Sequence, residues 1–486
     1  MSGFELAPVL GMSATDLAGA IRARTVSCAE VMRSFLDHIA ALNPAVNALV
    51  SLQPPERLLA QARARDEQLA RGEYLGPLHG MPQAVKDLAC TAGIRTTRGS
   101  PLYDTVPEHD SILAERLRRA GALLIGKSNT AELGLGSQTY NPLFGTTLNA
   151  YDPARTAGGS SGGAAVAVAL HMLPVADGSD MMGSLRNPAA YNNVFGFRPS
   201  CGRVPMAGEE LFFDQLGAWG AIGRSVTDVA LLMSVIAGPD PRVPFSIGED
   251  GQAFRAPLER SFAGARLGWL GNLSGHLPFE PGVLELCRTA CRDFEALGCR
   301  VEEVALPYAP DRLWDCWLKL RHWAVGGELE PLYRDPLKRE RMKPEAQWEV
   351  AGALALGALD VYRASLERSR WYAAASALFE RCDFLLLPSA QLFPFDAALH
   401  WPRAINGVAM DSYHRWMEVV VPASLLAGPV LGVPAGFGPQ NLPMGLQIIG
   451  PRHADFAVLQ LGHAYQLATR WVERRPPPLL TDARHG

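Results

Sequence analysis

The stretch from Arg155 to Pro188, RTAGGSSGGAAVAVALHMLPVADGSDMMGSLRNP, constrains the fold more than any other part of the chain. It contains two glycine-dense turns that hold serines, and one apolar run joins the turns. Glycine opens backbone conformations that other residues avoid and allows a ligand to approach closely. The run from Gly163 to Leu173 has almost no polar face, which predicts a buried helix. We therefore expect the serines to lie on buried turns beside this helix.

Two short motifs in the chain match known patterns literally. Residues 159–163, GSSGG, fit the nucleophile elbow G-x-S-x-G, with Ser161 as an esterase nucleophile. That motif follows a hydrophobic strand, whereas residues 151–156, YDPART, are polar and contain a proline. Residues 121–128, GALLIGKS, fit the phosphate-binding P-loop, but their apolar centre predicts a buried strand. Both matches are weaker hypotheses than the one that follows.

A third stretch places a lysine at the end of an apolar strand. Residues 76–87, GPLHGMPQAVKD, predict a strand over 82–85 that ends at Lys86. Most lysines in globular proteins are simply solvated, so Lys86 is a catalytic candidate only together with the serine turns.

Taken together, the Lys86 strand, GGSSGG and residues 178–188, GSDMMGSLRNP, resemble the amidase signature family of Ser–Ser–Lys amide hydrolases. The resemblance extends over nearly the whole chain. Further matching segments are 26–27, 43–48, 126–129 with Glu132, Asn149, 195–205, 433–437 and 442–450.

The resemblance implies specific catalytic roles. Ser184 would be the nucleophile, Ser160 the bridging serine on a cis peptide after Gly159, and Lys86 the base, with an acyl-enzyme intermediate. The chemistry of these residues is consistent with such roles, because a serine hydroxyl needs a neighbour that removes its proton. A lysine can do this at neutral pH only if burial lowers its pKa.

The resemblance also implies an oxyanion hole made by the backbone N–H groups of Met181, Met182, Gly183 and Ser184. The family pattern reads Gly-Thr-Asp-Thr-Gly-Gly-Ser, whereas this chain has Met181 and Met182 before Gly183. Met182 replaces a glycine and would not suit a positive φ. The two thioethers either narrow the pocket or pack away from it.

Other residues near the serines have expected supporting roles. Asp180 and Arg186 are expected to pair and brace the nucleophile turn. Ser161 either donates to the nucleophile or caps the buried helix. Lys127 is expected to be a structural lysine at the end of a strand.

Composition limits the possible partners. The chain has 486 residues, 48% of them hydrophobic, and a net charge of −4 with interleaved signs, which gives no nucleic-acid-binding stripe. Its eight cysteines lack zinc-ligand spacing, so we expect reduced thiols and neither metal nor cofactor. The first residues do not look like an export signal, and prolines and glycines interrupt the longest apolar stretch, 419–438. We expect a cytoplasmic protein without membrane contact.

For the fold, we expect one α/β domain over 1–486 with the amidase-signature fold: a single large, mixed, mostly parallel sheet flanked by helices on both faces. Within it, 13–71 would be an N-terminal helical region, 76–205 the catalytic core and 308–401 a variable helical region. Long helical runs are expected over 345–379 and 410–427.

Aromatic residues are frequent in the variable region. Aromatics at helical spacing usually belong to a core. The resemblance implies that some of these rings, with Phe393 and Phe395, form a substrate funnel. The implied substrate is an apolar or aryl amide, with esters and carbamates as further candidates, and the protein is a possible homodimer.

Three other functions remain open. The chain could be the glutaminase-type component of a tRNA-dependent amidotransferase, in the same family. It could be a binding protein with a relic site, or a nucleotide-binding protein that uses residues 121–128.

Overall fold

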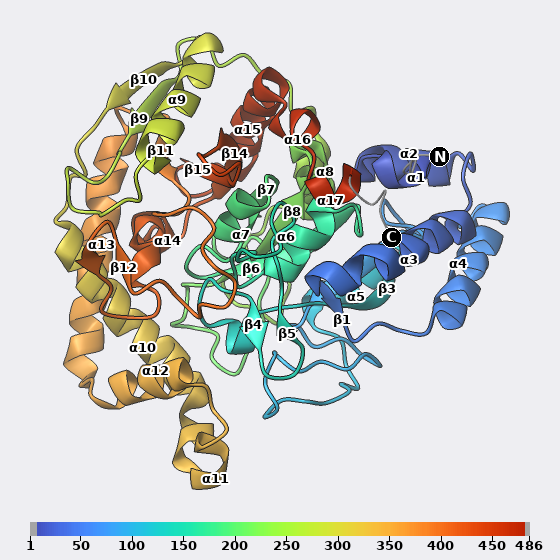
Figure 1. Cartoon of the computed structure of the whole chain (residues 1–486), viewed down its shortest axis with the longest axis horizontal. Coiled ribbons are helices and arrows are strands. Elements are labelled where there is room, and N and C mark those ends of the chain that lie inside the picture. The colour runs from blue at the N-terminus through green and yellow to red at the C-terminus, as the bar shows by residue number, and fades with distance from the viewer. Residues whose placement is uncertain (1–6, 482–486) are drawn as a thin grey trace.

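The computed structural model describes residues 7–481. Its N-terminal helices begin at caps that the sequence predicts. The Ser13 side chain accepts from the Asp16 N–H, and Ser27 and Glu30 form a capping box. These helices lie together on the right in Figure 1: α1 (Pro8–Gly11), α2 (Ala14–Arg22), α3 (Cys28–Val46) and α4 (Pro55–Ala70).

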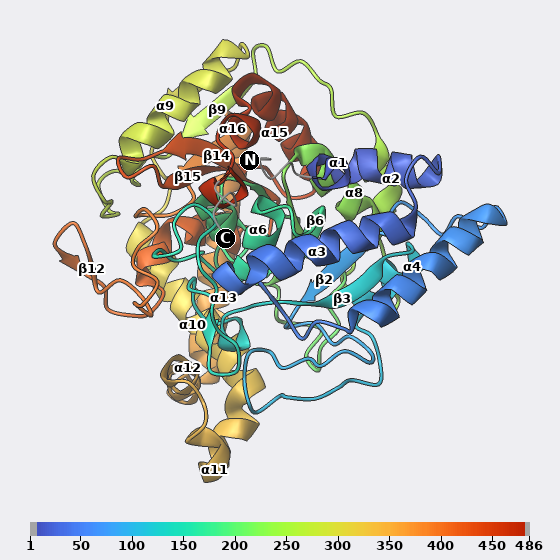
Figure 2. The same ribbon diagram turned by 45° about the vertical axis from the view of Figure 1, so that its right-hand side comes forward.

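A small sheet carries Lys86. It has the strand order β1 (Leu49–Val50), β3 (Leu123–Ser128), β2 (Pro82–Lys86), with β2 parallel and β1 antiparallel to β3. Every residue of β2 and β3 is buried. The predicted strand over 122–125 is thereby confirmed, so the P-loop pattern lies largely in an extended strand. Helices α3 and α4 lie near this sheet in Figure 2, and α5 (Ile112–Arg119) precedes β3.

The larger sheet has eight strands. In spatial order they are β10 (Arg300–Glu303), β9 (Arg266–Trp269), β11 (Phe384–Pro388), β15 (Pro443–Ile449), β14 (Val430–Phe437), β7 (Phe195–Arg198), β8 (Ala218–Gly223) and β6 (Val175–Asp180). The mixed character is confirmed.

The expectation of mostly parallel strands in one sheet is wrong. Among the described residues, only the β10–β9 and β9–β11 pairs of this sheet are parallel, and the other five are antiparallel. One reason is local: the five residues 438–442 join β14 to β15, which is too short for a parallel crossover. In addition, β1, β2 and β3 form their own sheet.

Helices cover both faces of the large sheet, as predicted. One layer contains α6 (Gly162–Ala169) and α7 (Arg186–Tyr191), and the other contains α8 (Val226–Ile236), α9 (Val283–Ala296) and α15 (Asp455–Thr469). All eight residues of α6 are buried, which confirms the prediction for the apolar run.

The region predicted as variable is helical and lies on the left in Figure 1. Its helices are α10 (Pro310–Arg334), α11 (Pro336–Arg339), α12 (Pro344–Leu354) and α13 (Ala358–Phe379). The expected run over 345–379 is therefore two helices, interrupted at residues 355–357. The expected helix over 410–427 is mostly absent, because only η3 (Arg415–Val420) and α14 (Val421–Leu425) form there and Met417 has non-helical φ and ψ.

Short elements complete the described chain: η1 (Glu132–Gly134), β4 (Tyr140–Asn141), β5 (Gly145–Thr146), η2 (Gly251–Arg255), β12 (Ala404–Ile405), β13 (Val408–Ala409), α16 (Trp471–Arg474) and α17 (Pro478–Thr481). No helix within residues 7–481 is both long and apolar enough to cross a membrane.

The two sheets meet where β2 lies beside β6. Side chains connect them there: Gln83 Nε2 donates to the Val175 carbonyl at 3.1 Å, and the Lys86 backbone N–H donates to Asp177 Oδ2 at 3.1 Å. This contact, the sheet seam, places the end of β2 against the end of β6.

Candidate active site

The Lys86 side chain lies at the sheet seam among three hydroxyls. Its Nζ is 2.9 Å from Ser160 Oγ, 2.8 Å from Ser161 Oγ and 2.9 Å from Ser179 Oγ. The residue is fully buried. Burial lowers the pKa of Lys86 from 10.5 to about 7, although Asp177 and Asp180 act in the opposite direction. A large fraction of this amine is therefore neutral at physiological pH.

Ser160 follows a cis peptide bond after Gly159, as the resemblance implies. The Gly159 N–H donates to Asn187 Oδ1 at 3.1 Å. Gly158 has a φ of +72°, and a Cβ on it would lie 2.5 Å from the same Asn187 oxygen. The turn before Ser160 is thus packed tightly against α7.

Ser161 occupies the N-cap position of α6, but its side chain makes no capping hydrogen bond. Its hydroxyl instead contacts Lys86 and lies 3.2 Å from the Ser179 carbonyl. The capping alternative is therefore wrong. The described residues show no side-chain hydrogen bond from Ser161 to Ser184, so the donor alternative stays a prediction.

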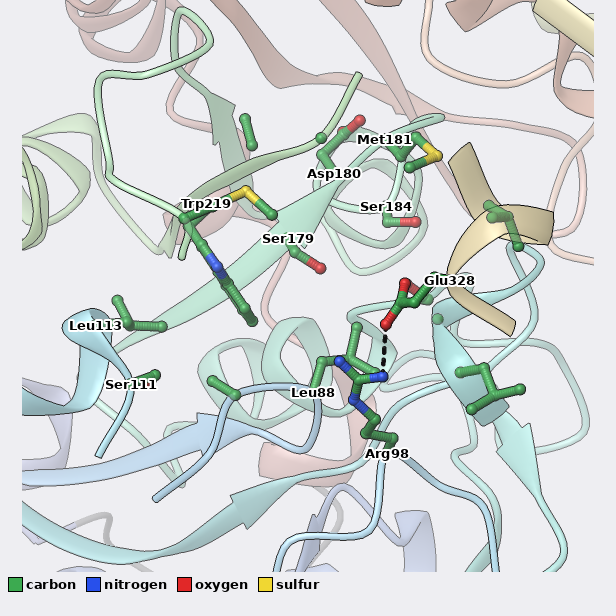
Figure 3. Close-up of a pocket in the computed structure, with 18 of the residues that line it drawn as sticks. Leu88, Arg98, Ser111, Leu113, Ser179, Asp180, Met181, Ser184, Trp219 and Glu328 are labelled. Atoms are coloured by element: carbon green, nitrogen blue, oxygen red, sulfur yellow. Dashed lines mark hydrogen bonds and ion pairs between the residues drawn. The ribbon is translucent and has the colours of Figure 1, made fainter. Parts of the chain in front are cut away.

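Ser184 faces the same cavity as Ser160 and Ser179, and Figure 3 shows its hydroxyl there beside Ser179. The Ser161 N–H donates to the Ser184 carbonyl at 3.3 Å, which holds the two serine turns together. Within residues 7–481, no hydrogen bond joins the hydroxyls of Ser160 and Ser184. The structure thus gives the Lys86–Ser160 link directly, and the Ser160–Ser184 link stays a prediction.

The predicted Asp180–Arg186 pair is confirmed. Arg186 Nε donates to Asp180 Oδ2 at 2.9 Å, and Nη2 donates to Oδ1 at 2.8 Å, with both side chains fully buried. Burial raises the pKa of Asp180, but the Arg186 guanidinium outweighs burial and holds this pKa well below its usual range. Asp180 also accepts from the Leu185 N–H at 3.0 Å. The pair therefore braces the turn that carries Ser184.

The backbone of this turn refines the oxyanion prediction. The Gly183 N–H donates to Asp180 Oδ1 at 2.8 Å, so it is already engaged. Gly183 has a φ of +85°, whereas Met182 does not have a positive φ. The methionine that replaces a glycine thus lies where no left-handed backbone is needed. Met181, Met182 and Ser184 remain the proposed oxyanion donors.

The cavity at the serines measures about 610 Å³. Its lining includes both Met181 and Met182, so these side chains shape the site rather than pack away from it. Apolar residues form much of the rest: Leu88, Leu113, Leu133, Trp219, Val325 and Leu329. In Figure 3, Trp219 and Leu113 lie on one side of the view, and the joined Arg98 and Glu328 lie on the other.

The predicted aromatic funnel is wrong in its residues. Trp314, Trp317 and Trp371 are buried in the core, and so are Phe393 and Phe395. The described lining of the cavity contains none of these rings. Their region contributes through one face of α10 instead, with Arg321, Val325, Glu328 and Leu329, which are spaced as one side of a helix.

Several residues of the site escape local sequence patterns. Ser179 and Asp177 alternate along β6 within the motif stretch, and this alternation was their only signal. Arg321, from α10, donates to Glu349 Oε1 at 2.7 Å and to the Tyr413 hydroxyl at 2.6 Å, and its Nη1 lies 3.3 Å from Met181 Sδ. Nothing near Arg321 or Arg98 in the sequence indicates their place at the cavity.

Lys127 has the predicted structural role. It is buried near the end of β3, and its Nζ donates to the Ala89 carbonyl at 2.6 Å and to Thr91 Oγ1 at 2.8 Å. Burial lowers the pKa of Lys127 to about 8. Its two bonds point to a segment away from the serines, so it does not duplicate Lys86.

Comparisons with known proteins agree with this geometry. The family model described as Amidase matches residues 30–459. The chain is 32% identical to an acylamidase of Rhodococcus erythropolis, over 97% of this chain and 98% of that protein. It is also 32% identical to the A-type component of the glutamyl-tRNA(Gln) amidotransferase of Thermosynechococcus vestitus, over 93% of this chain and 96% of that protein.

Among solved structures, the chain resembles a bacterial aryl acylamidase of the amidase signature enzymes. The TM-score is 0.89 with 29% identity, and the match covers 99% of each chain. A peptide amidase from Stenotrophomonas maltophilia matches with a TM-score of 0.80 and 26% identity, over 97% of this chain and 99% of that chain.

Proposed function

Because the chain belongs to the amidase signature family, whose members hydrolyse C–N amide bonds, we propose that Ser184 attacks the amide carbonyl and that Lys86, acting through Ser160, is the base. The observation that carries this proposal is the Lys86 amine. It is fully buried, its pKa is about 7, and it lies 2.9 Å from the Ser160 hydroxyl. A neutral amine in this position can accept a proton at physiological pH.

The proposed reaction has two halves. In the first, Ser184 Oγ bonds to the carbonyl carbon as its proton moves to Ser160, and the Ser160 proton moves to Lys86 Nζ. The N–H groups of Met181, Met182 and Ser184 stabilise the oxyanion. The Lys86 ammonium then returns its proton by the same route to the departing amine, and the C–N bond breaks. In the second half, water replaces the amine and hydrolyses the acyl-enzyme.

The proposed substrates are apolar or aryl amides, with esters and carbamates as further candidates. Trp219, Leu113 and Val325 give the cavity apolar walls that suit such groups. The likeness to an acylamidase and to an aryl acylamidase supports the same class.

A second candidate is the glutamine-hydrolysing component of a tRNA-dependent amidotransferase. The identity of 32% to such a component, over nearly the whole chain, favours it. Ammonia release from glutamine, by the chain with its partner proteins, would support this function over the first. An apolar cavity offers little to a small polar amide, which is why we place this candidate second.

The nucleophile assignment is tested with Ser184→Ala. We expect loss of anilide hydrolysis and of labelling by a fluorophosphonate probe, because no attacking hydroxyl remains. Ser376→Ala, an exposed serine on α13, is the matched control and should keep both. Lys86→Ala should lose anilide hydrolysis at neutral pH and keep some ester hydrolysis, since an alkoxide leaves without the proton that an amine needs. Full anilide turnover by Ser184→Ala would refute the assignment.

A further inference from the structure

An ion pair bridges two distant segments at the catalytic cavity. Arg98 Nη1 donates to Glu328 Oε1 at 2.7 Å, and both residues line the cavity that holds Ser160 and Ser184. Arg98 belongs to the segment that follows β2, and Glu328 to α10. Their side chains are 33% and 58% exposed, so the pair lies where the cavity opens to solvent.

The guanidinium of this pair is held in place by its own segment. It lies 4.7 Å from the centre of the Tyr103 ring. The Arg98 carbonyl accepts from the Leu133 N–H at 2.8 Å. The next residue, Gly134, packs close to the catalytic turn, because a Cβ on it would lie 3.8 Å from Ser160 Oγ. Arg98 therefore keeps its position relative to the serines without Glu328.

Glu328 depends on Arg98 more than Arg98 depends on it. Within residues 7–481, Arg98 is the one hydrogen-bond and ion-pair partner found for the Glu328 side chain. The other guanidinium of the cavity, Arg321, is compensated differently, by the fully buried Glu349 and by Tyr413. Glu328 is thus the exposed carboxylate whose removal would leave a fixed, uncompensated guanidinium at the cavity.

We propose that Glu328 determines the charge preference of this site: by neutralising Arg98, it makes the cavity select uncharged amides over amides that carry a carboxylate. A substrate carboxylate can bind Arg98 only by displacing Glu328, and it is repelled by that group and by Asp214, which also lines the cavity. Without Glu328, the Arg98 fork would be free for a charge-assisted bond to such a substrate. This inference rests on the proposed amide hydrolysis.

The test uses substrates that differ only in charge. On the acyl side, glutaryl 4-nitroanilide is compared with 5-oxohexanoyl 4-nitroanilide, in which a methyl ketone replaces the carboxylate. On the amine side, the hexanoyl amide of 4-aminobenzoate is compared with that of 4-aminoacetophenone. The ratio of kcat/KM for carboxylate over ketone is measured for the wild type, Glu328→Gln, and the double variant Arg98→Gln/Glu328→Gln.

We expect the wild type to prefer the ketone in both pairs. Glu328→Gln should raise the carboxylate-to-ketone ratio about tenfold in the pair whose carboxylate reaches Arg98, and the double variant should lose this gain. Glu330→Gln is the matched control, since Glu330 lies on the same helix and pairs with Arg334 outside the cavity. An unchanged ratio in both pairs for Glu328→Gln would overturn the proposal, and so would a gain that persists in the double variant.

The outcome can be separated from the proposed catalytic roles. Calorimetric binding of the same four compounds is measured in the Ser184→Ala background with and without Glu328→Gln, and the same shift in the ratio of Kd values is expected. If the wild type hydrolyses none of these amides, or Ser184→Ala hydrolyses them fully, the proposed function fails, and the binding ratio still decides the role of Glu328.

Discussion

Lowering the pH protonates the Lys86 amine and removes the proposed base. With a pKa of about 7, about 90% of the amine is neutral at pH 8 and about 1% at pH 5. If the neutral amine is required, kcat/KM for an anilide falls about 90-fold between these pH values, and it levels off above pH 8. A lysine with the ordinary pKa of 10.5 would be only about 0.3% neutral at pH 8 and would show no plateau there.

The assay follows kcat/KM for 5-oxohexanoyl 4-nitroanilide between pH 5 and pH 10, by release of 4-nitroaniline. Circular dichroism at each pH controls for unfolding. The plateau is the decisive feature, because it depends on the burial of Lys86 and not only on the presence of a lysine. A rate that keeps rising about tenfold per pH unit beyond pH 9 would refute the neutral buried base, and so would a rate that does not change between pH 6 and pH 8.

Two further substitutions test what surrounds the base. Asp177→Asn removes a carboxylate that raises the pKa of Lys86, so the midpoint of the acid limb in the same assay should move below 7, by about one pH unit or less; an unchanged or higher midpoint would contradict this. Asp180→Asn breaks a fully buried ion pair and should lower the free energy of unfolding by about 3–5 kcal/mol, measured by urea denaturation. Asp104→Asn, in the exposed Arg95–Asp104 pair, is the control and should cost under about 1 kcal/mol; equal losses in the two variants would show that Asp180 does not brace the turn.

The core of the site could be predicted because its residues lie in short, ordered motifs. Ser160, Ser184 and the Asp180–Arg186 pair all fall within one stretch of 34 residues, and Lys86 ends a strand that is apolar in every reading. Local patterns of this kind report directly on turns, buried helices and strand ends. They also predicted the caps of α2 and α3 at Ser13 and Ser27.

The direction of the strands and the wall of the cavity could not be predicted in the same way. β11 pairs with β9 and β15, which are far from it in the sequence, so its neighbours depend on how the whole chain packs. Arg98 and Glu328 are 230 residues apart, and each alone reads as an ordinary surface charge. The aromatic residues of the variable region fill its core, which their helical spacing already favoured over a role in the cavity.

The sheet seam has a consequence for how this protein would lose activity on heating. The base stands on one sheet and Ser179 on the other, and side chains such as Gln83 and Asp177, rather than a ladder of backbone bonds, hold the two strands in line. A slip of about an ångström at this contact would separate the amine from its hydroxyls while each sheet stayed folded. Turnover would then fade at temperatures where spectroscopy still reports a native protein, so attempts to make the enzyme tolerate heat should be screened by rate and not by melting temperature.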